Sequence, residues 1–510
     1  MPRGNVEQEP HFDVAIVGGG SAGALLAARL SEEPDRRILL IEAGEEAADP
    51  DIWNPAAWPA LQGRSYDWDY RTAPQAGTAG RVHHWARGRL IGGSSCLHAM
   101  GYMRGHPSDF EAWVDATGDA RWSWNQLLPV FQAIEDHPLG GDGIHAKGGP
   151  LPIYLPTDEV SPLARAFIEA GSALGLSRLD GHNSGEMIGV TPNSLNIRGG
   201  RRVTVADAWL TNAVRSRGNL AIRTGSRVRR LNMEGRRIRN LEVVGKQGPI
   251  NVFANQVVLS AGALESPALL MRSGIGPRDT LHAAGVTCLI DMPEVGRNLQ
   301  DHLLGAGNLY AARRPVPPSR LQHSESMAYM RAGSFTSTGQ PEIVVGCGVA
   351  PIVSECFHAP AAGQAYSLLF GITHPTSRGS VRISGPELSD RLVIDPEYLQ
   401  TAQDRDLFRR ALEAAREMGH RTELAEWRES ELLPAALNID DFIAQSVITH
   451  HHPCGTCRMG KDSDAVTDAN LRLRALDNLF VADASVIPRL TAGPIHAAVL
   501  AIAESFARHF

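Results

Sequence analysis

Hydrophobic residues near the N-terminus fall into short runs that predict a strand, a helix and a second strand in succession. Residues 12–17 (FDVAIV) form an apolar, β-branched run that is typical of a buried strand. A glycine-rich turn over residues 18–23 follows, and residues 22–30 (AGALLAARL) carry apolar side chains at helical spacing. Residues 37–41 (RILLI) predict the second strand. This order is typical of an α/β fold with a parallel sheet.

The remainder of the chain predicts a second sheet and a return to the first. Residues 257–277 (VVLSAGALESPALLMRSGIGP) indicate a strand, a tight turn and a helix. Between residues 309 and 440, turn residues separate short β-like runs at 341–349, 366–373 and 379–384. Three further elements are predicted: an amphipathic helix over 404–421, a buried strand over 478–484 and a closing helix over 496–509.

Composition narrows the class of protein. The chain has 510 residues, of which 43% are hydrophobic and 21% are charged, so it can bury a large core and form two or more domains. The net charge is −7 and no basic block is present, which argues against nucleic acid and anionic lipid as partners.

Cysteine usage and apolar run lengths bear on the compartment. The six cysteines are too scattered for a disulfide framework, which favours a reducing compartment. Residues 1–10 are polar and carry no export signal, and no apolar run approaches the ~20 residues that span a bilayer. We therefore expect a soluble cytoplasmic protein with no membrane partner.

The turn after the first strand carries a dinucleotide-binding pattern. Gly18 permits the turn, Gly20 lets the backbone approach a pyrophosphate, and Gly23 allows close packing of the following helix. The positive helix N-terminus favours the phosphates, and Glu42, nineteen residues beyond Gly23, is placed to accept hydrogen bonds from a ribose. The alternative is a glycine-rich turn with no ligand. The predicted contacts from this region are Gly18, Gly20, Ser21, Ala22, Gly23, Glu42 and Ala43.

A cluster of imidazoles occupies residues 449–456 (THHHPCGT). If the segment is extended, alternate side chains share a face, so His450 and His452 lie together. An imidazole has a pKa near ~6.5 and suits general-base work on an alcohol. Two alternatives remain: a hydrogen-bonded structural histidine, and a zinc site that includes Cys454 and Cys457. The crowding of these ligand types within eight residues argues against zinc, so no metal is expected.

Six motifs in order resemble the glucose-methanol-choline (GMC) family of FAD-dependent oxidoreductases: the Gly18 turn with Glu42, GGSS, GALESPALLMRSGIGP, VGRNLQDH, HHHPCGTCRMG and FVADASVIP. The resemblance spans nearly the whole chain. It implies a discontinuous Rossmann-like FAD domain (1–155, 190–308 and 441–510) and a substrate domain (156–189 and 309–440) with an antiparallel sheet packed by helices.

The resemblance also implies further FAD contacts, at Gly93, Ser94, His98, Ala99, Met100, Val228, Ala261, Asp483, Ala484, Pro494 and Ile495. Ordinary strand packing is the alternative for Val228, Asp483 and Ala484. His98 stands where the family has asparagine, which puts one flavin contact in doubt. Leu97 aligns with the histidine through which some members attach FAD, so we expect non-covalent FAD.

By family position, His452 is the catalytic base. The second catalytic position, normally His or Asn, is Pro494 here. Because proline offers no side-chain donor or acceptor, the hydrogen bond to the substrate oxygen must come from another residue, and His450 is the candidate.

The implied activity is that of a monomeric alcohol oxidase. It would convert the 4-hydroxymethyl group of pyridoxine to the aldehyde pyridoxal, with dioxygen reduced to hydrogen peroxide, in vitamin B6 degradation. The alternatives are a choline-type or aliphatic-alcohol dehydrogenase with a quinone acceptor, a flavin-containing hydroxynitrile lyase, and a non-catalytic FAD-binding protein.

Overall fold

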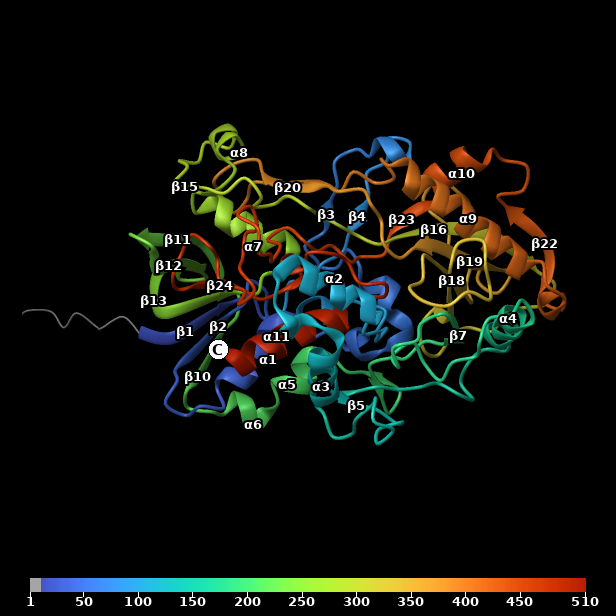
Figure 1. The fold of residues 1–510 in the computed structure, drawn as a ribbon, viewed down its shortest axis with the longest axis horizontal. Coiled ribbons are helices and arrows are strands. Elements are labelled where there is room, and N and C mark those ends of the chain that lie inside the picture. The colour runs from blue at the N-terminus through green and yellow to red at the C-terminus, as the bar shows by residue number, and fades with distance from the viewer. Residues whose placement is uncertain (1–10) are drawn as a thin grey trace, which may run out of the picture.

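The computed structural model describes residues 11–510, in which two large sheets lie on opposite sides of a central group of helices (Figure 1). Residues 1–10, on which the expectation of no export signal rests, lie outside the described part of the chain. Within 11–510, no helix is both long and apolar enough to cross a membrane.

The first sheet is mixed and has the strand order β10-β2-β1-β13-β12-β11, with β24 beside β13. Its strands β10, β2, β1 and β24 run parallel to the second half of β13, while β13, β12 and β11 form an antiparallel meander. The bounds are β1 (His11–Val17), β2 (Ile38–Ile41), β10 (Leu220–Arg223), β11 (Arg227–Glu234), β12 (Arg237–Gly245), β13 (Gly248–Leu259) and β24 (Leu479–Val481). The predicted strands at 12–17 and 37–41 are confirmed, and the strand predicted at 478–484 is present over the shorter range Leu479–Val481.

The register of this sheet aligns the strand ends that matter for binding. Val17 pairs with both Ile41 and Leu259, and Leu259 pairs with Val481. The carboxyl ends of β1, β2, β13 and β24 therefore lie level with one another. In an open α/β sheet, this edge is where ligands bind.

Helix α1 packs on strands β1 and β2 of the first sheet, and α9 packs on the second sheet. The central helix α1 is buried on nearly every side and packs against α11, and both lie in the middle of the molecule in Figure 1. The helix bounds are α1 (Ser21–Leu30), α2 (Pro107–Thr117), α3 (Trp124–Ile134), α4 (Pro162–Ala173), α5 (Val205–Trp209), α6 (Asn212–Arg215), α7 (Gly262–Arg272), α8 (Arg278–Ala283), α9 (Ala402–Gly419), α10 (Ile439–Ser446) and α11 (His496–His509).

The second sheet is antiparallel, with the strand order β22-β16-β19-β18-β17-β7 and with β23 also paired to β16. The amphipathic helix α9 packs on it through Phe408, Leu412 and Ala415 and leaves its charged face outward, as its pattern predicts. The bounds are β7 (Gly189–Pro192), β16 (Leu303–Ala312), β17 (Ser324–Met330), β18 (Ile343–Gly348), β19 (Ala365–Ile372), β22 (Arg428–Leu433) and β23 (Val447–Thr449).

Two-stranded ladders complete the fold. The predicted strand at 379–384 is β20, which pairs with β21 alone and does not join the second sheet. The ladders are β3 (Tyr70–Arg71) with β4 (His84–Trp85), β5 (Glu135–Asp136) with β6 (Leu151–Pro152), β8 (Ile197–Arg198) with β9 (Arg201–Arg202), β14 (Ile275–Gly276) with β15 (Ile290–Asp291), and β20 (Ser380–Ile383) with β21 (Leu392–Asp395).

Sheet membership differs from the predicted domain boundaries at three places. The strand β23 and most of β7 and β16 fall in the ranges assigned to the FAD domain, yet all three are hydrogen-bonded into the second sheet. Local hydrophobic patterns do not report strand partners that are distant in sequence, which explains the difference. The division into two domains itself stays a prediction.

Candidate active site

A cavity of about 680 Å³ opens at the carboxyl edge of the first sheet and extends to the second sheet. The turn after β1, the end of β2 and the residues after β13 and β24 line it on one side. Leu304 of β16, Met327 of β17 and Leu369 of β19 line it on the other. A volume of this size is within the range of small-molecule and cofactor sites.

The glycine-rich turn places the N-terminus of α1 against the cavity. Gly18 has a φ of +104°, which favours glycine, and both Gly18 and Gly20 line the cavity. A Cβ atom added to Gly23 would lie 1.8 Å from the Gly18 carbonyl oxygen, so glycine lets α1 begin directly at the turn. No side chain caps this helix N-terminus. Its free N–H groups and positive dipole end can therefore receive a phosphate.

Glu42 lies at the end of β2 and is buried, with its carboxylate held by backbone donors. The N–H groups of Gly19 and Gly44 donate to it at 2.7 and 2.8 Å. Burial raises the pKa of Glu42 to about 7, and the two backbone donors oppose that rise. Each carboxylate oxygen can accept a further hydrogen bond. Because Glu42 also lines the cavity, its carboxylate can accept one from a ribose hydroxyl.

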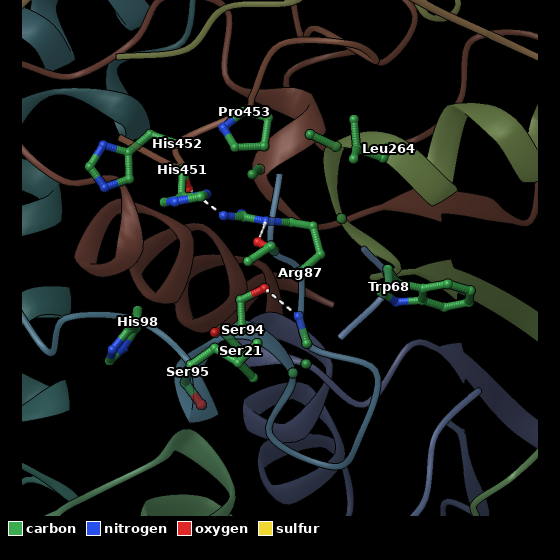
Figure 2. Close-up of a pocket in the computed structure, with 18 of the residues that line it drawn as sticks. Ser21, Trp68, Arg87, Ser94, Ser95, His98, Leu264, His451, His452 and Pro453 are labelled. Atoms are coloured by element: carbon green, nitrogen blue, oxygen red, sulfur yellow. Dashed lines mark hydrogen bonds between the residues drawn. The ribbon is translucent and has the colours of Figure 1, made fainter. Parts of the chain in front are cut away.

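The loop at residues 92–96 closes over the turn from the other side. A Cβ atom on Gly93 would lie 2.6 Å from the Gly20 Cα, so the two glycine-rich segments touch and form a backbone cradle. Ser94 accepts a hydrogen bond from the Gly88 N–H, which Figure 2 shows beside Ser21 and Ser95. This cradle fits the flat, phosphate-bearing cofactor that the pattern predicts.

Asp483 lies two residues beyond β24 and ties three segments together at the cavity. Its carboxylate accepts hydrogen bonds from the Gly262 N–H, the Ser266 hydroxyl and the Ser485 N–H at 2.8, 2.5 and 2.8 Å. Burial raises its pKa, against the effect of these donors. Asp483 and Ala484 both line the cavity, as does Val228 of β11.

His98 and His496 present unused polar atoms to the cavity. The Met100 N–H donates to His98 Nδ1 at 2.9 Å, so in a neutral ring Nε2 carries the hydrogen, and Nε2 has no hydrogen-bond partner among the described residues. Both ring nitrogens of His496 are likewise unpartnered, and the two ring centroids are 4.7 Å apart. Buried polar groups are costly when unpaired, so these atoms fit a polar ligand edge. The site thus suits a flavin cofactor.

The histidine segment is less regular than its sequence predicts. Regular strand ends at Thr449, and His451 has a φ of +62°, so the segment is not extended. His450 and His452 nevertheless both line the cavity, with ring centroids 4.4 Å apart. The Arg87 side chain donates to the His451 carbonyl at 2.6 Å, and Figure 2 shows the His452 ring turned away from this contact. The predicted proximity of the two rings is therefore present by another backbone route.

The carboxylate of Asp301 holds the histidine segment by hydrogen bonds. This buried carboxylate accepts hydrogen bonds from the His452 N–H at 2.7 Å and from the hydroxyls of Thr449 and Tyr398 at 2.6 and 2.5 Å. Burial raises the pKa of Asp301 to about 6, while these donors act in the opposite direction. The contacts fix the backbone on both sides of His450.

His302 contacts the ring of His452 directly. The two Nδ1 atoms are 2.9 Å apart, and His302 Nε2 lies 2.8 Å from the Thr373 carbonyl oxygen. Burial, followed by the neighbouring His450, lowers the pKa of His302 to about 3. Burial is also the main cause that holds the pKa of His452 well below its usual value. Both rings are therefore neutral near pH 7.

Most predicted site residues surround the cavity, and two do not. The lining includes Gly18, Gly20, Ser21, Ala22, Glu42, Ala43, Gly93, Ser94, His98, Ala99, Val228, Ala261, His450, His452, Asp483, Ala484, Pro494 and Ile495. Gly23 packs inside the turn, and Met100 packs against Leu195, Ile197 and Leu321. These two support the cavity from behind its wall.

The cavity also contains residues that sequence reasoning missed. Asn193, Gln322 and Ser324 supply polar groups beside the apolar side chains of Met103, Met327, Ile352 and Leu369. Nothing local in the sequence marks these residues. His302 and Asp301 lie in the VGRNLQDH motif, which is a signal, but the motif alone does not show which side chains they meet.

The two cysteines of the alternative zinc site do not lie as metal ligands would. Cys454 and Cys457 are fully buried in the hydrophobic core around the first sheet. Burial raises the pKa of both thiols, which disfavours the thiolate that binds zinc. Within residues 11–510, no group of three or more histidine, cysteine or acidic side chains is arranged to hold a metal ion.

Comparisons with known proteins find similar chains and a similar fold. Pyridoxine 4-oxidase of Microbacterium luteolum is 66% identical over 503 residues, which cover 98% of this chain and 99% of the relative. The crystal structure of pyridoxine 4-oxidase from Mesorbium loti superposes with a TM-score of 0.97 at 82% identity and covers 98% of this chain and 99% of that chain. Mitochondrial choline dehydrogenase of Homo sapiens is 34% identical over 536 residues, 98% of this chain and 90% of the relative.

The family profile of GMC oxidoreductases matches in two parts, residues 12–304 and residues 375–503. The two matches together cover most of the chain and include the glycine-rich turn, Glu42, His302 and the histidine segment. The chain therefore belongs to the GMC oxidoreductase family.

Proposed function

We propose that the protein is an FAD-dependent alcohol oxidase that converts the 4-hydroxymethyl group of pyridoxine to the aldehyde pyridoxal in vitamin B6 degradation. One dioxygen is reduced to one hydrogen peroxide for each alcohol oxidised, so two electrons and two protons leave the substrate. The observation that carries the proposal is the 66% and 82% identity, over nearly the whole chain, to two proteins named pyridoxine 4-oxidase.

GMC oxidoreductases bind FAD, and the cradle described above suits that cofactor. In our proposal, the N-terminus of α1 and the Gly18–Gly20 turn hold the pyrophosphate, and Glu42 holds the ribose of the adenosine half. Gly93, Ser94, His98 and Asp483 hold the remainder. When bound, FAD accepts a hydride from the substrate carbon, chemistry that side chains do not supply.

His452 is the proposed base for the hydroxyl proton. Its ring lines the cavity and is neutral near pH 7, and its backbone is fixed by Asp301. A general base of this kind contributes roughly 10²–10⁴-fold to the rate. The pyridine ring of the substrate would lie against the apolar side chains of Met103, Met327 and Leu369.

His450 is the proposed second contact to the substrate oxygen. Pro494 lines the cavity at the position where the family resemblance implies His or Asn, and its side chain offers no hydrogen bond. The His450 ring is close to His452 and has no hydrogen bond from its own ring nitrogens to any residue within 11–510. We expect His450→Ala to slow turnover, and near-normal turnover would contradict this role.

Product analysis tests the proposed reaction. Purified enzyme should consume oxygen with pyridoxine and form pyridoxal and hydrogen peroxide in equal amounts. 4-Deoxypyridoxine, which lacks only the reacting hydroxyl, is the matched control and should give neither product. Oxidation of choline or simple alcohols in place of pyridoxine would contradict the substrate, and reduction of a quinone without oxygen uptake would contradict the oxidase.

Three finer features belong to the same proposal. FAD is held non-covalently, so acid precipitation should release a yellow supernatant, while a yellow pellet would contradict it. The protein is cytoplasmic, in keeping with six cysteines that are all free. It is a monomer, in keeping with the scatter of its exposed large apolar side chains, and sedimentation at micromolar concentration tests this.

A further inference from the structure

The register of the second sheet brings His302 between the histidine segment and a fixed carbonyl group. Leu303 at the start of β16 pairs with Thr449 of β23 on one side and with Ile372 of β19 on the other. His302, one residue before β16, therefore lies between His450 and Thr373. The His450 N–H donates to the His302 carbonyl oxygen at 2.9 Å, which continues the ladder by one step.

The hydrogen bonds of His302 determine where its proton lies. A backbone carbonyl oxygen can only accept, so the 2.8 Å contact with Thr373 requires a hydrogen on His302 Nε2. His302 is 4% exposed and neutral near pH 7, so its Nδ1 then has a lone pair and no hydrogen. In the 2.9 Å contact between the two rings, His452 Nδ1 must be the donor.

The position of this hydrogen determines which ring nitrogen of His452 can act as the base. If Nδ1 of neutral His452 carries the hydrogen, Nε2 has the free lone pair that a general base needs. No residue within 11–510 forms a hydrogen bond to His452 Nε2, and His452 lines the cavity. The His450 ring is near but forms no hydrogen bond to His452, so it does not determine this choice.

We propose that His302 is a positioning residue that holds His452 in its Nδ1-protonated tautomer, so that Nε2 faces the substrate hydroxyl as the base. The inference rests on the proposed function, in which His452 takes that proton. When His452 accepts the proton from the O–H bond at Nε2, its Nδ1–H remains bonded to His302, and no proton passes to His302.

Thr373 gives this arrangement a rigid end. Its N–H donates to the Glu342 carbonyl at 3.0 Å and its hydroxyl donates to the Pro341 carbonyl at 2.7 Å. Because His302 is a neutral acceptor, it orients His452 without the rise in pKa that a carboxylate partner would cause. The base therefore stays unprotonated below neutral pH.

The test compares two substitutions at the same position in the FAD-loaded enzyme. His302→Asn keeps an oxygen acceptor near the place of Nδ1, and His302→Leu removes the acceptor. We measure the rate of flavin reduction by pyridoxine without oxygen, the substrate dissociation constant and the FAD content. We expect His302→Leu to slow reduction by roughly 10- to 100-fold with substrate affinity and FAD content unchanged, and His302→Asn to stay within about 5-fold.

A spectroscopic readout separates orientation from packing. In enzyme labelled with ¹⁵N-histidine, the His452 signals, assigned by their loss in His452→Ala, should report a protonated Nδ1 in the wild type and a mixture of tautomers in His302→Leu. The inference would be overturned if His302→Leu reduced its flavin at the wild-type rate, or if His452 of the wild type carried its hydrogen on Nε2. Equal loss of rate in both variants with loss of FAD would also overturn it.

One further variant separates this inference from the function on which it rests. His452→Ala should abolish rapid reduction. If it does and His302→Leu is unaffected, the positioning role alone is wrong. If His452→Ala reduces flavin at the wild-type rate, His452 is not the base and the proposed mechanism is wrong.

Discussion

At the scale of single residues, the ring of His452 is kept neutral by its surroundings. Burial is the largest cause of its lowered pKa, followed by the neighbouring imidazoles of His450 and His302. A neutral imidazole can accept a proton at once, whereas an imidazolium cannot. The buried position and the adjacent rings therefore work together to keep the base ready at neutral pH.

The pH dependence of the reaction should report this environment. The rate is lost as the pH falls through the pKa of His452, because the base becomes protonated. His450→Gln removes a neighbour that lowers this pKa, so the acid limb of the reduction rate should move to higher pH, toward the usual value of ~6.5. An unchanged or lower acid limb would contradict this. The other titratable groups around His452 are His302, His451, Arg87 and Asp301.

At the scale of elements, short connections at the ends of strands form the site. The local patterns of β1, β2, α9 and α11 are strong, and sequence reasoning located all four. It did not find His302, because His302 and His452 are 150 residues apart and meet only through the pairing of β16 with β23. It also assumed an extended segment at His450–His452, where the left-handed conformation of His451 intervenes.

The junction between β1 and α1 should tolerate no side chain at Gly23. In Gly23→Ala, the added Cβ would collide with the Gly18 carbonyl oxygen, so the turn must open and the FAD content should fall. Gly218→Ala is the matched control, because nothing lies within 4 Å of the Cβ position at Gly218. The ratio of FAD absorbance to protein measures the effect. Equal FAD content in both variants would contradict the packing role of Gly23.

Asp301 should stabilise the segment that follows β23. Its carboxylate accepts hydrogen bonds from the His452 N–H, the Thr449 hydroxyl and the Tyr398 hydroxyl. Asparagine replaces one of the two acceptor oxygens by an NH2 group, so at least one of these donors loses its acceptor. We expect Asp301→Asn to lower the free energy of unfolding by about 1–3 kcal/mol. The exposed Asp115→Asn is the control, and denaturant unfolding is the measurement. Equal stability of the two variants would contradict the account.

At the scale of the whole molecule, each of the two sheets forms one side of the cavity. The first sheet presents the level ends of β1, β2, β13 and β24, which form the cofactor side of the cavity, and the second sheet carries His302 and His450 at the ends of β16 and β23. Figure 1 shows these sheets on opposite sides of α1, α2 and α11. The motifs could predict both halves, but only the assembled fold shows that the cavity joins them.

The central claim is that this cavity holds FAD and that His452 serves its reduction by pyridoxine. The most direct measurement is the absorbance spectrum of the purified wild-type and His452→Ala enzymes without oxygen, before and after addition of pyridoxine. We predict rapid bleaching of the flavin band in the wild type, its return when air is admitted, and bleaching slower by roughly 10²–10⁴-fold in His452→Ala. An unbleached wild-type spectrum, or equal bleaching of the two enzymes, would contradict the account.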